Sequence, residues 1–371
     1  MANTKKNTKI EQAPAKQISF AAIEQYVVSN ILNPTETTNI GSKFVIWGDR
    51  NAWPQYIHNL YKNVPTVKSV INGSVDYVLG NNIKCNVSKF EDSVNMRGET
   101  WNDLIENIAR DYYIYGGFAI NVIRDKSGNV NGLYYLNMMN IRTDKDNNEF
   151  YYSDDWSKSY GRVKYTVYPK FNKDGKDASS VFYYKNDYNQ TYPASIWEGS
   201  VKAAEIEKCI DEYHLNNVKN NFSGNYIVNF NNGQPSDAQK EEIESNFNEK
   251  YTGTENSGRV ILSWNDSKDN ETTIAKIESE DFGAKYDSLA KRVRQSIFTS
   301  FRATPNLFGI PTETTGFNSQ EYEEAFKLYN RTQIRPLQIK IVDAIDKILG
   351  VKGSIEIAPF TLNNDTEQIV K

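Results

Sequence analysis

Apolar residues recur at helical spacing in several stretches of the chain and predict its first helices. Residues 65–79 (PTVKSVINGSVDYVL) carry apolar side chains three or four positions apart, and Pro65 stands near the start as an N-terminal signal. Residues 101–115 form a clearer apolar stripe, which Gly116-Gly117 ends. The segment 18–31 is also compatible with a short helix.

Strands are predicted between these helices and residue 195. The run 118–124 (FAINVIR) is followed by the turn 125–129, and 133–138 (LYYLNM) is expected to pair back as the second arm of a hairpin. From 150 to 195 the sequence is rich in Tyr and alternates in character, as at 163–168 and 181–184. This pattern favours further antiparallel strands.

The second half of the chain alternates long helices with a compact insert. Helical periodicity predicts one helix over 197–220 and another over 281–303. Between them, 225–230 (NYIVNF) and 259–264 (RVILSW) are expected to be strands, with a helix that begins at Ser236 as N-cap and runs to Tyr251. The insert therefore has the order strand, helix, strand.

A loop punctuated by Pro and Gly, 305–317 (PNLFGIPTETTGF), follows the second long helix. It is longer than most connections between helices, and long loops are often functional or disordered. A last long helix is expected from Asn318 or Ser319 to about Leu349, with a kink at Pro336. The text SIEIAPFTL after Gly353 is compatible with one more strand.

The composition narrows the possible functions. The chain has 371 residues, and its aromatic content of 13% makes global disorder improbable. With 43 basic and 47 acidic residues, the formal net charge is 43 − 47 = −4. That charge excludes a wholly basic nucleic-acid coat. The basic start MANTKKNTK has no apolar run after it, and no stretch of about 18 apolar residues occurs. We therefore expect no signal peptide, no membrane span and a reducing cytoplasm as the default compartment.

Motifs for enzyme chemistry are missing. The sequence holds no P-loop, no GxGxxG after a strand, no HExxH and no GxSxG, and only two His and two Cys. We expect His214 to make a polar contact between helices rather than act as a base, and Cys209 to pack rather than act as a nucleophile. The acidic pairs Asp154-Asp155 and Glu323-Glu324 are expected on solvated faces or turns rather than on a metal. The sequence therefore predicts no catalytic residues, no metal site, no cofactor and no enzyme.

Three features remain, and each has a plain alternative. Two long helices around a small module place that module at the tip of a stalk, but an ordinary helical hairpin with a decorated loop has the same pattern. Residues 252–262 (TGTENSGRVIL) form a polar turn between glycines, which by itself fits any loop. The long loop 305–320 is the third feature, and its plain alternative is a simple connector between two helices.

Taken together and in order, over about residues 40–350, these features resemble the portal proteins of tailed bacteriophages, the head-to-tail connectors. Residues 101–142 resemble the family's wing segment, and 214–235 resemble its first stem helix running into the clip. Residues 252–259 resemble the turn of the clip, 305–309 the end of the second stem helix, and 328–336 the stretch before the Pro kink. Little sequence follows Gly350, so a large crown domain is not expected.

The resemblance implies an α+β, portal-like elongated subunit with a mixed α/β wing, two long stem helices, a small strand-helix-strand clip and a kinked C-terminal helix. The implied units are a flexible N-terminal tail (1–17), the wing (18–196), stem helix 1 (197–222), the clip (223–276), stem helix 2 (277–304), the channel loop (305–317), the kinked helix returning to the wing (318–350) and a short crown or C-terminal tail (351–371).

The function that the resemblance implies is a homo-oligomeric ring, typically of twelve subunits, at one capsid vertex of the virion. Double-stranded DNA is packaged and ejected through such a ring, which assembles in the host cytoplasm. The implied partners are the terminase large subunit, the major capsid protein and scaffold, and a head-tail connector or adaptor. Two alternatives stay open: a different virion scaffold or adaptor oligomer without a DNA channel, and an intracellular nucleic-acid enzyme with an unrecognised site.

Three sets of candidate residues follow from the resemblance. The channel loop is expected to face DNA through Thr312, Glu313, Thr314, Thr315, Gly316, Phe317 and Asn318. The clip is expected to contact the motor and then the connector through Gly253, Asn256, Gly258 and Arg259. The helix 281–303 carries five basic and two acidic residues, a charge of +3, and Lys291, Arg292 and Arg294 are candidates for contacts between subunits.

Overall fold

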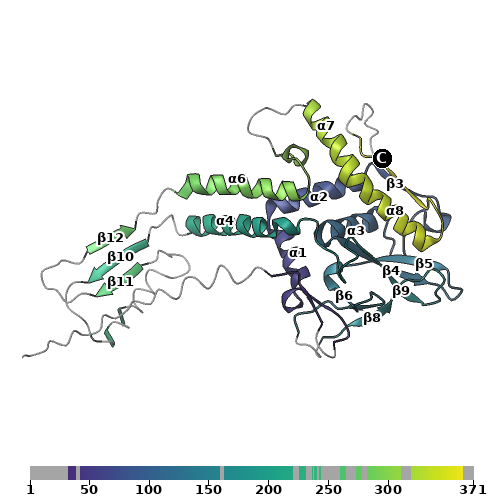
Figure 1. Cartoon of the computed structure of the whole chain (residues 1–371), viewed down its shortest axis with the longest axis horizontal. Helices are drawn as coiled ribbons and strands as arrows, with labels where there is room; N and C mark the ends of the chain where they lie inside the picture. Colours follow the sequence, from purple (N-terminus) through teal and green to yellow (C-terminus); the bar gives the residue numbers. More distant parts are fainter. Residues whose placement is uncertain are drawn as a thin grey trace, which may run out of the picture.

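The structure is a computed structural model. It describes residues 32–38, 42–158, 163–219, 225–230, 236, 238–239, 242–243, 260–264, 273–277, 282–310 and 319–361. The expected N-terminal tail and the segment 18–31 lie outside these residues. The described part divides into a mixed α/β body, a pair of long helices that projects from it, and a small sheet beyond the helix pair (Figure 1).

Three helices pack together in the body. They are α1 (Trp53–Asn63), α2 (Pro65–Leu79) and α3 (Trp101–Tyr115). The apolar stripes of α2 and α3 are buried, as their periodicity predicts. Helix α1 was not predicted from the sequence, although Trp53, Ile57 and Leu60 have helical spacing and are buried.

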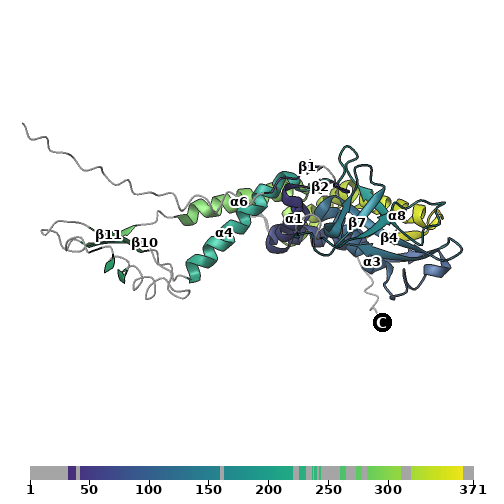
Figure 2. The same ribbon diagram turned by 90° about the horizontal axis from the view of Figure 1, so that it is seen from below.

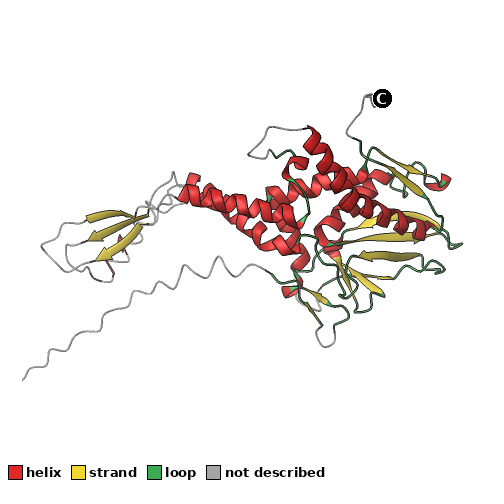
Figure 3. Ribbon diagram, turned by 45° about the horizontal axis from the view of Figure 1, so that its top comes forward, coloured by secondary structure: helices red, strands yellow, loops and turns green. Residues whose placement is uncertain are grey.

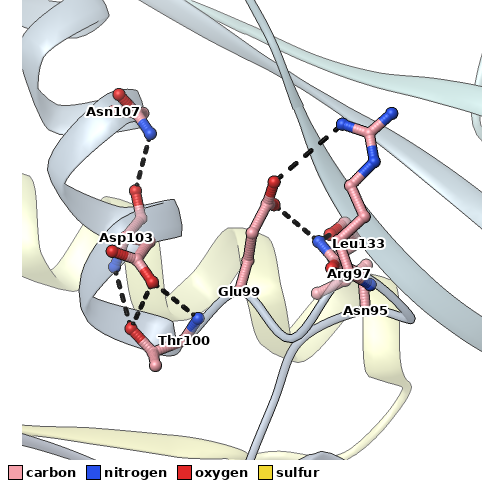
Figure 4. A network of polar contacts seen from close by, with 7 residues as sticks. All are labelled: Asn95, Arg97, Glu99, Thr100, Asp103, Asn107 and Leu133. Carbon is pink, nitrogen blue, oxygen red and sulfur yellow. Dashed lines mark hydrogen bonds and ion pairs between the residues drawn. The ribbon is translucent and has the colours of Figure 1, made fainter.

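The start of α3 is held by a polar network (Figure 4). The Thr100 hydroxyl accepts from the Asp103 amide, and the Asp103 carboxylate accepts from the Thr100 amide at 2.8 Å, which makes a capping box. Just before it, the Asn95 side-chain amide donates to the Leu133 carbonyl at 2.8 Å and to the Glu99 carboxylate. The network ties the entry of α3 to the neighbouring hairpin.

The predicted hairpin is part of a three-stranded antiparallel sheet, and its first strand is the central one. Its strands are β4 (Gly117–Arg124) and β5 (Val130–Leu136), and β9 (Ser179–Lys185) pairs with the other edge of β4. Gly116, between α3 and β4, has φ +86°, and the Ala194 carbonyl oxygen lies where a Cβ would be. A side chain at Gly116 is therefore excluded both by the backbone and by space.

Smaller sheets complete the body. The strands β6 (Ile141–Thr143), β7 (Glu149–Tyr152) and β8 (Thr166–Pro169) form an antiparallel sheet, and β1 (Glu36–Thr37) pairs with β2 (Ile46–Trp47). The strand expected in SIEIAPFTL is present as β13 (Ile355–Ala358). It pairs antiparallel with β3 (Asn82–Cys85), which the sequence pattern did not indicate. Short 3-10 turns occur at Asp49–Asn51, Ser88–Phe90 and Met138–Asn140.

The two long helices of the second half lie side by side and project from the body (Figures 1 and 2). They are α4 (Val201–Lys219) and α6 (Phe282–Ser300). The expected start of the first helix at 197 is wrong by one turn, because Glu198–Ser200 is a 3-10 helix. Trp197 is fully buried there, with its ring centroid 6.3 Å from that of Phe301.

The sheet beyond the helix pair contains three strands rather than the two expected (Figure 3). Strand β10 (Asn225–Phe230) pairs in parallel with β11 (Val260–Trp264) and antiparallel with β12 (Thr273–Ile277). The predicted helix between β10 and β11 is described only in part. Its N-cap is confirmed, because the Ser236 hydroxyl accepts from the Gln239 amide while the Gln239 side chain accepts from the Ser236 amide.

The last helix is interrupted rather than simply kinked at Pro336. After the 3-10 helix Pro305–Phe308, the chain forms α7 (Ser319–Tyr329), a π-helical segment Asn330–Ile334, and α8 (Arg335–Leu349). Pro336 stands in the first turn of α8, where its missing N–H is tolerated. The five residues before α8, Asn330–Ile334, form the wider π-helical turn at the point where the two helices join.

Candidate functional site

Two of the three predicted sets of site residues lie outside the described part of the chain. These are the channel-loop residues Thr312, Glu313, Thr314, Thr315, Gly316, Phe317 and Asn318, and the clip residues Gly253, Asn256, Gly258 and Arg259. The third set, Lys291, Arg292 and Arg294, lies on α6. The site is therefore built from α4, α6 and the described flanks of the segment 311–318.

Helix α6 divides into a buried and an exposed face. Val293 and Ile297, one turn apart, are buried, while Lys291, Arg292 and Arg294 between and before them are exposed. Within the chain, burial raises the pKa of Glu207 on α4, and the nearby charge of Arg294 partly opposes that rise. Arg292 is exposed to solvent.

The helix pair is joined to the body at Glu207. This side chain is buried, and its Oε1 accepts from the Thr66 hydroxyl at 2.7 Å and from the Thr66 amide at 3.4 Å. Thr66 lies in the first turn of α2, where free amides favour a negative charge. Burial nevertheless dominates and raises the pKa of Glu207. Two residues before Glu207, Glu205 accepts from the Tyr56 hydroxyl of α1 at 3.2 Å.

Aromatic rings bridge α4 and α6 farther from the body. Tyr213 stacks on Tyr286 with centroids 4.8 Å apart, and the His214 ring lies 5.7 Å from that of Tyr286. His214 thus makes an interhelix contact, as expected, but with an aromatic ring. Cys209 is a partly exposed thiol whose pKa burial raises, which opposes formation of the nucleophilic thiolate.

Large apolar side chains remain exposed on the long helices. On α4, Ile206 and Leu215 are 39% and 52% exposed, and on α6, Leu289 is 36% exposed. Leu328 on α7 and Ile339 on α8 are exposed as well. An isolated exposed apolar residue is ordinary, but several along a narrow pair of helices indicate a surface that another protein covers.

The two described flanks of the segment 311–318 meet the same helix, which the sequence pattern does not predict. Before the segment, Leu307 is buried and its carbonyl accepts from the Tyr77 hydroxyl of α2 at 2.7 Å. After it, the Tyr322 hydroxyl of α7 lies 3.1 Å from the same Tyr77 oxygen. The only sequence signal for this role was that Tyr77 is a polar-tipped residue on the apolar face of a helix.

Among the described residues, no group of three or more His, Cys, Asp and Glu is arranged to hold a metal ion. Asp155 pairs with Lys158 at 3.2 Å, and Glu324 pairs with Lys327 at 2.8 Å, on exposed surfaces as expected. None of the helices in the described ranges is long and apolar enough to cross a membrane.

Comparisons with solved structures match this fold. A chain in the virion of a native gene transfer agent (GTA) particle has a TM-score of 0.53 at 16% identity, covering 85% of this chain and 84% of that one. A chain in the neck of an empty GTA particle, computed with C6 symmetry, has a TM-score of 0.52 at 15% identity, with 85% of each chain covered. A HK97 family phage portal protein from Corynebacterium diphtheriae has a TM-score of 0.50 at 12% identity, covering 78% of this chain and 88% of that one.

Comparisons of the sequence with curated proteins match shorter parts of the chain. An uncharacterized protein of Rickettsia bellii is 28% identical over 200 residues, which are 52% of this chain and 48% of that protein. An uncharacterized protein of Rickettsia felis is 33% identical over 128 residues, 33% of this chain and 30% of that protein. The chain thus spans about half the length of the first curated relative and less than a third of the second. The family model described as phage portal protein matches residues 95–366, most of the chain. The resemblance inferred from the sequence is confirmed: the chain belongs to the phage portal protein family.

Proposed function

We propose that this chain is the subunit of a portal ring at one capsid vertex, through which double-stranded DNA enters and leaves. Family membership and the fold shared with GTA neck and phage portal chains support the proposal. The ring is homo-oligomeric and has twelve subunits, the number typical of the portal proteins that the sequence resembles. The protein belongs to the virion and assembles in the host cytoplasm.

The observation that carries the proposal is the set of exposed apolar side chains on the projecting helices. Ile206, Leu215 and Leu289 lie on helices that pack against each other and leave these residues between 36% and 52% exposed. Covering them with neighbouring copies gains free energy from each apolar contact, roughly 25 cal/mol per Å² buried. Interfaces with an apolar core and a charged rim are the usual kind in stable oligomers.

Charge complementarity between the two helices favours the same arrangement. Helix α6 carries four basic residues and one acidic residue, a charge of +3, whereas α4 carries three basic and four acidic residues, a charge of −1. In a ring, the outer face of α6 in one subunit meets α4 of the next. In this arrangement the exposed Arg292 meets acidic side chains on α4 of the neighbour, which also sets the register of the contact.

A nearly uncharged loop suits passage of DNA better than capture. Between Thr312 and Asn318, Glu313 is the sole charged residue, and the whole chain carries −4. Each Lys or Arg contact with a phosphate adds affinity, and a ring repeats every contact in each subunit. We assign Thr312, Thr314, Thr315 and Asn318 transient hydrogen bonds to the passing DNA.

The remaining partners follow from the same assignment. The clip, with Gly253, Asn256, Gly258 and Arg259, contacts the terminase large subunit during packaging and a head-tail connector or adaptor afterwards. The wing contacts the major capsid protein and scaffold during head assembly. No catalytic residue, cofactor or metal takes part in this function.

Deletion of residues 312–317 tests the function. Particles that carry the deletion should assemble rings of normal size but package or retain less DNA than particles with the full chain. An internal deletion of equal length in the exposed turn region 172–177 serves as the control for chain shortening. Normal DNA content in the 312–317 variant contradicts the channel assignment.

A further inference from the structure

One face of α2 receives both flanks of the segment 311–318. Gly73, Ser74 and Tyr77 share this face, three or four positions apart. A Cβ on Gly73 would come within 2.7 Å of the Phe308 ring, so this position must stay small for Phe308 to pack there. The Ser74 hydroxyl lies 2.7 Å from that of Tyr329, at the end of α7. Phe308 precedes the segment and Tyr329 follows it.

The hydroxyl of Tyr77 connects the two flanks by itself. A carbonyl oxygen can only accept, so the single Tyr77 proton is committed to the Leu307 carbonyl, 2.7 Å away. The Tyr322 hydroxyl, 3.1 Å away, must then be the donor to the Tyr77 oxygen. The result is a directed chain from Tyr322 through Tyr77 to Leu307, in which each hydrogen bond polarises and strengthens the next.

The surroundings hold Tyr77 in this position. Its ring is surrounded by the rings of Phe308, Phe326, Tyr329 and Phe360, with centroids 5.1 to 6.4 Å away. Burial raises the pKa of Tyr77 above its ordinary value, so the hydroxyl keeps its proton. Packing therefore fixes the position of the Tyr77 ring, and its hydroxyl makes the hydrogen bonds that connect the two flanks.

We propose that Tyr77 is the positioning residue that ties together the two ends of the segment 311–318 and holds both against α2. The relevance of this tie to DNA passage rests on the proposed function, since there the segment faces the channel. Closing a loop at a fixed point removes conformational freedom from the residues within it. One hydroxyl in each subunit thus fixes where the loop leaves the body and where it returns.

Hydrogen exchange on the purified full-length protein tests the tie. The substitution Tyr77→Phe removes the hydroxyl and keeps the ring in its aromatic surroundings. Exchange should rise about fivefold or more, both at the amides of Leu307, Gly309 and Ile310 and in the first turns of α7. The matched control is Tyr61→Phe, which removes a hydroxyl that bonds Asn72 on α2 at 2.8 Å and should change neither flank. Unchanged exchange in Tyr77→Phe, or a change in one flank only, overturns the proposal.

A distance measurement separates positioning from general stability. Spin labels on cysteines introduced at the exposed positions Thr304 and Glu324, in a Cys209→Ser background, report the separation of the two flanks. The distance distribution should broaden in Tyr77→Phe and in Tyr322→Phe, and the double variant should broaden it no further than Tyr77→Phe. An unchanged width in Tyr77→Phe, or additive broadening, overturns the proposal.

Failure of the proposed tie through Tyr77 can be distinguished from failure of the proposed portal function. Exchange and spin-label distances are measured whatever the oligomeric state, so they test the tie even if no ring forms. DNA retention by particles carrying Tyr77→Phe tests the link to function and should fall together with the loss of exchange protection. Increased exchange with normal DNA retention supports the tie and contradicts the channel role of the segment instead.

Discussion

Thr66 donates both its hydroxyl and its backbone amide to one oxygen of the Glu207 carboxylate. The two residues are 141 positions apart, and their contact joins the first turn of α2 to the first half of α4. It is one of the buried contacts that fix the projecting helices to the body. The direction of the helix pair relative to the body therefore depends in part on this contact.

Replacing Thr66 by Val should loosen that attachment. The substitution conserves shape and keeps the amide, but it leaves the buried Glu207 carboxylate with one strong donor fewer. A hydrogen bond to a charged group contributes roughly 1.5–3 kcal/mol, so we expect a loss of about 2 kcal/mol in the free energy of unfolding by urea. The control Thr299→Val removes an exposed hydroxyl that bonds only the Gln295 carbonyl, and should cost under about 0.5 kcal/mol. Equal effects of the two substitutions would contradict this role of Thr66.

Asp111 makes stability depend on pH near neutrality. It is buried on α3, accepts from the Met138 amide and the Tyr135 hydroxyl, and burial raises its pKa to about 7 from an ordinary 3.8. Because the folded-state pKa is the higher one, the stabilisation from the protonated form is complete below pH 3.8 and is lost as the pH rises through about 7.

The variant Asp111→Asn cannot ionise, so its stability relative to the natural chain should increase between pH 4 and pH 7 and level off near pH 8. Urea unfolding at a series of pH values gives this difference. A difference that stays constant over the series would show that Asp111 does not titrate in that range.

Arg142 should be among the most sensitive positions in the body. Its fully buried guanidinium donates to carbonyl and amide oxygens of Asn51, Gln55, Met139 and Ile141, and it lies 4.8 Å from the centre of the Trp156 ring. Burial lowers the pKa of Arg142 only to about 10, so it stays charged at neutral pH.

Arg142→Met keeps much of the volume but leaves these oxygens without a donor, and we expect a loss of about 3 kcal/mol or more in the free energy of unfolding. Arg97→Met, at an exposed ion pair with Glu99, should change it by under about 0.5 kcal/mol. A loss below about 1 kcal/mol for Arg142→Met would contradict the described network.

Charge reversal on α6 should weaken assembly. Arg292→Glu is the sharper choice than Arg294→Glu, because Arg294 also acts on Glu207 within the same chain. We expect a lower fraction of rings at equal protein concentration, and a smaller difference at high salt, where charge contacts are screened. The control Lys126→Glu makes the same change of charge in the exposed turn between β4 and β5. If both variants assemble like the natural chain, Arg292 makes no contact between subunits.

Local patterns were sufficient for the elements with strong periodicity. The apolar stripe of α3 and its terminating Gly116 lie where the sequence predicts them, because each depends on neighbours in the chain. The hairpin β4–β5 forms as predicted, but its second strand spans Val130–Leu136 rather than 133–138. Helix α1 was missed although Pro54 and the spacing of Trp53, Ile57 and Leu60 could have indicated it.

Elements that depend on partners far away in the chain could not be predicted from local sequence patterns. Strand β3 is defined by its pairing with β13, and Ile83 opposes Ile357. Strand β12 has five residues, and its alternation is too short to distinguish it from a loop without its partner β10. For the same reason, the tie through Tyr77 is visible only once α2, Leu307 and Tyr322 are brought together by the fold.

The central claim is that this chain forms a ring around a channel. Negative-stain images of the purified protein, with its mass in solution measured by mass photometry, test that claim most directly. The account predicts rings with a central hole and a mass that is a whole multiple of the 42.5 kDa chain. The resemblance to portal proteins implies a mass of about twelve chains. A monomer at micromolar concentration, or a closed oligomer without a central hole, would contradict it.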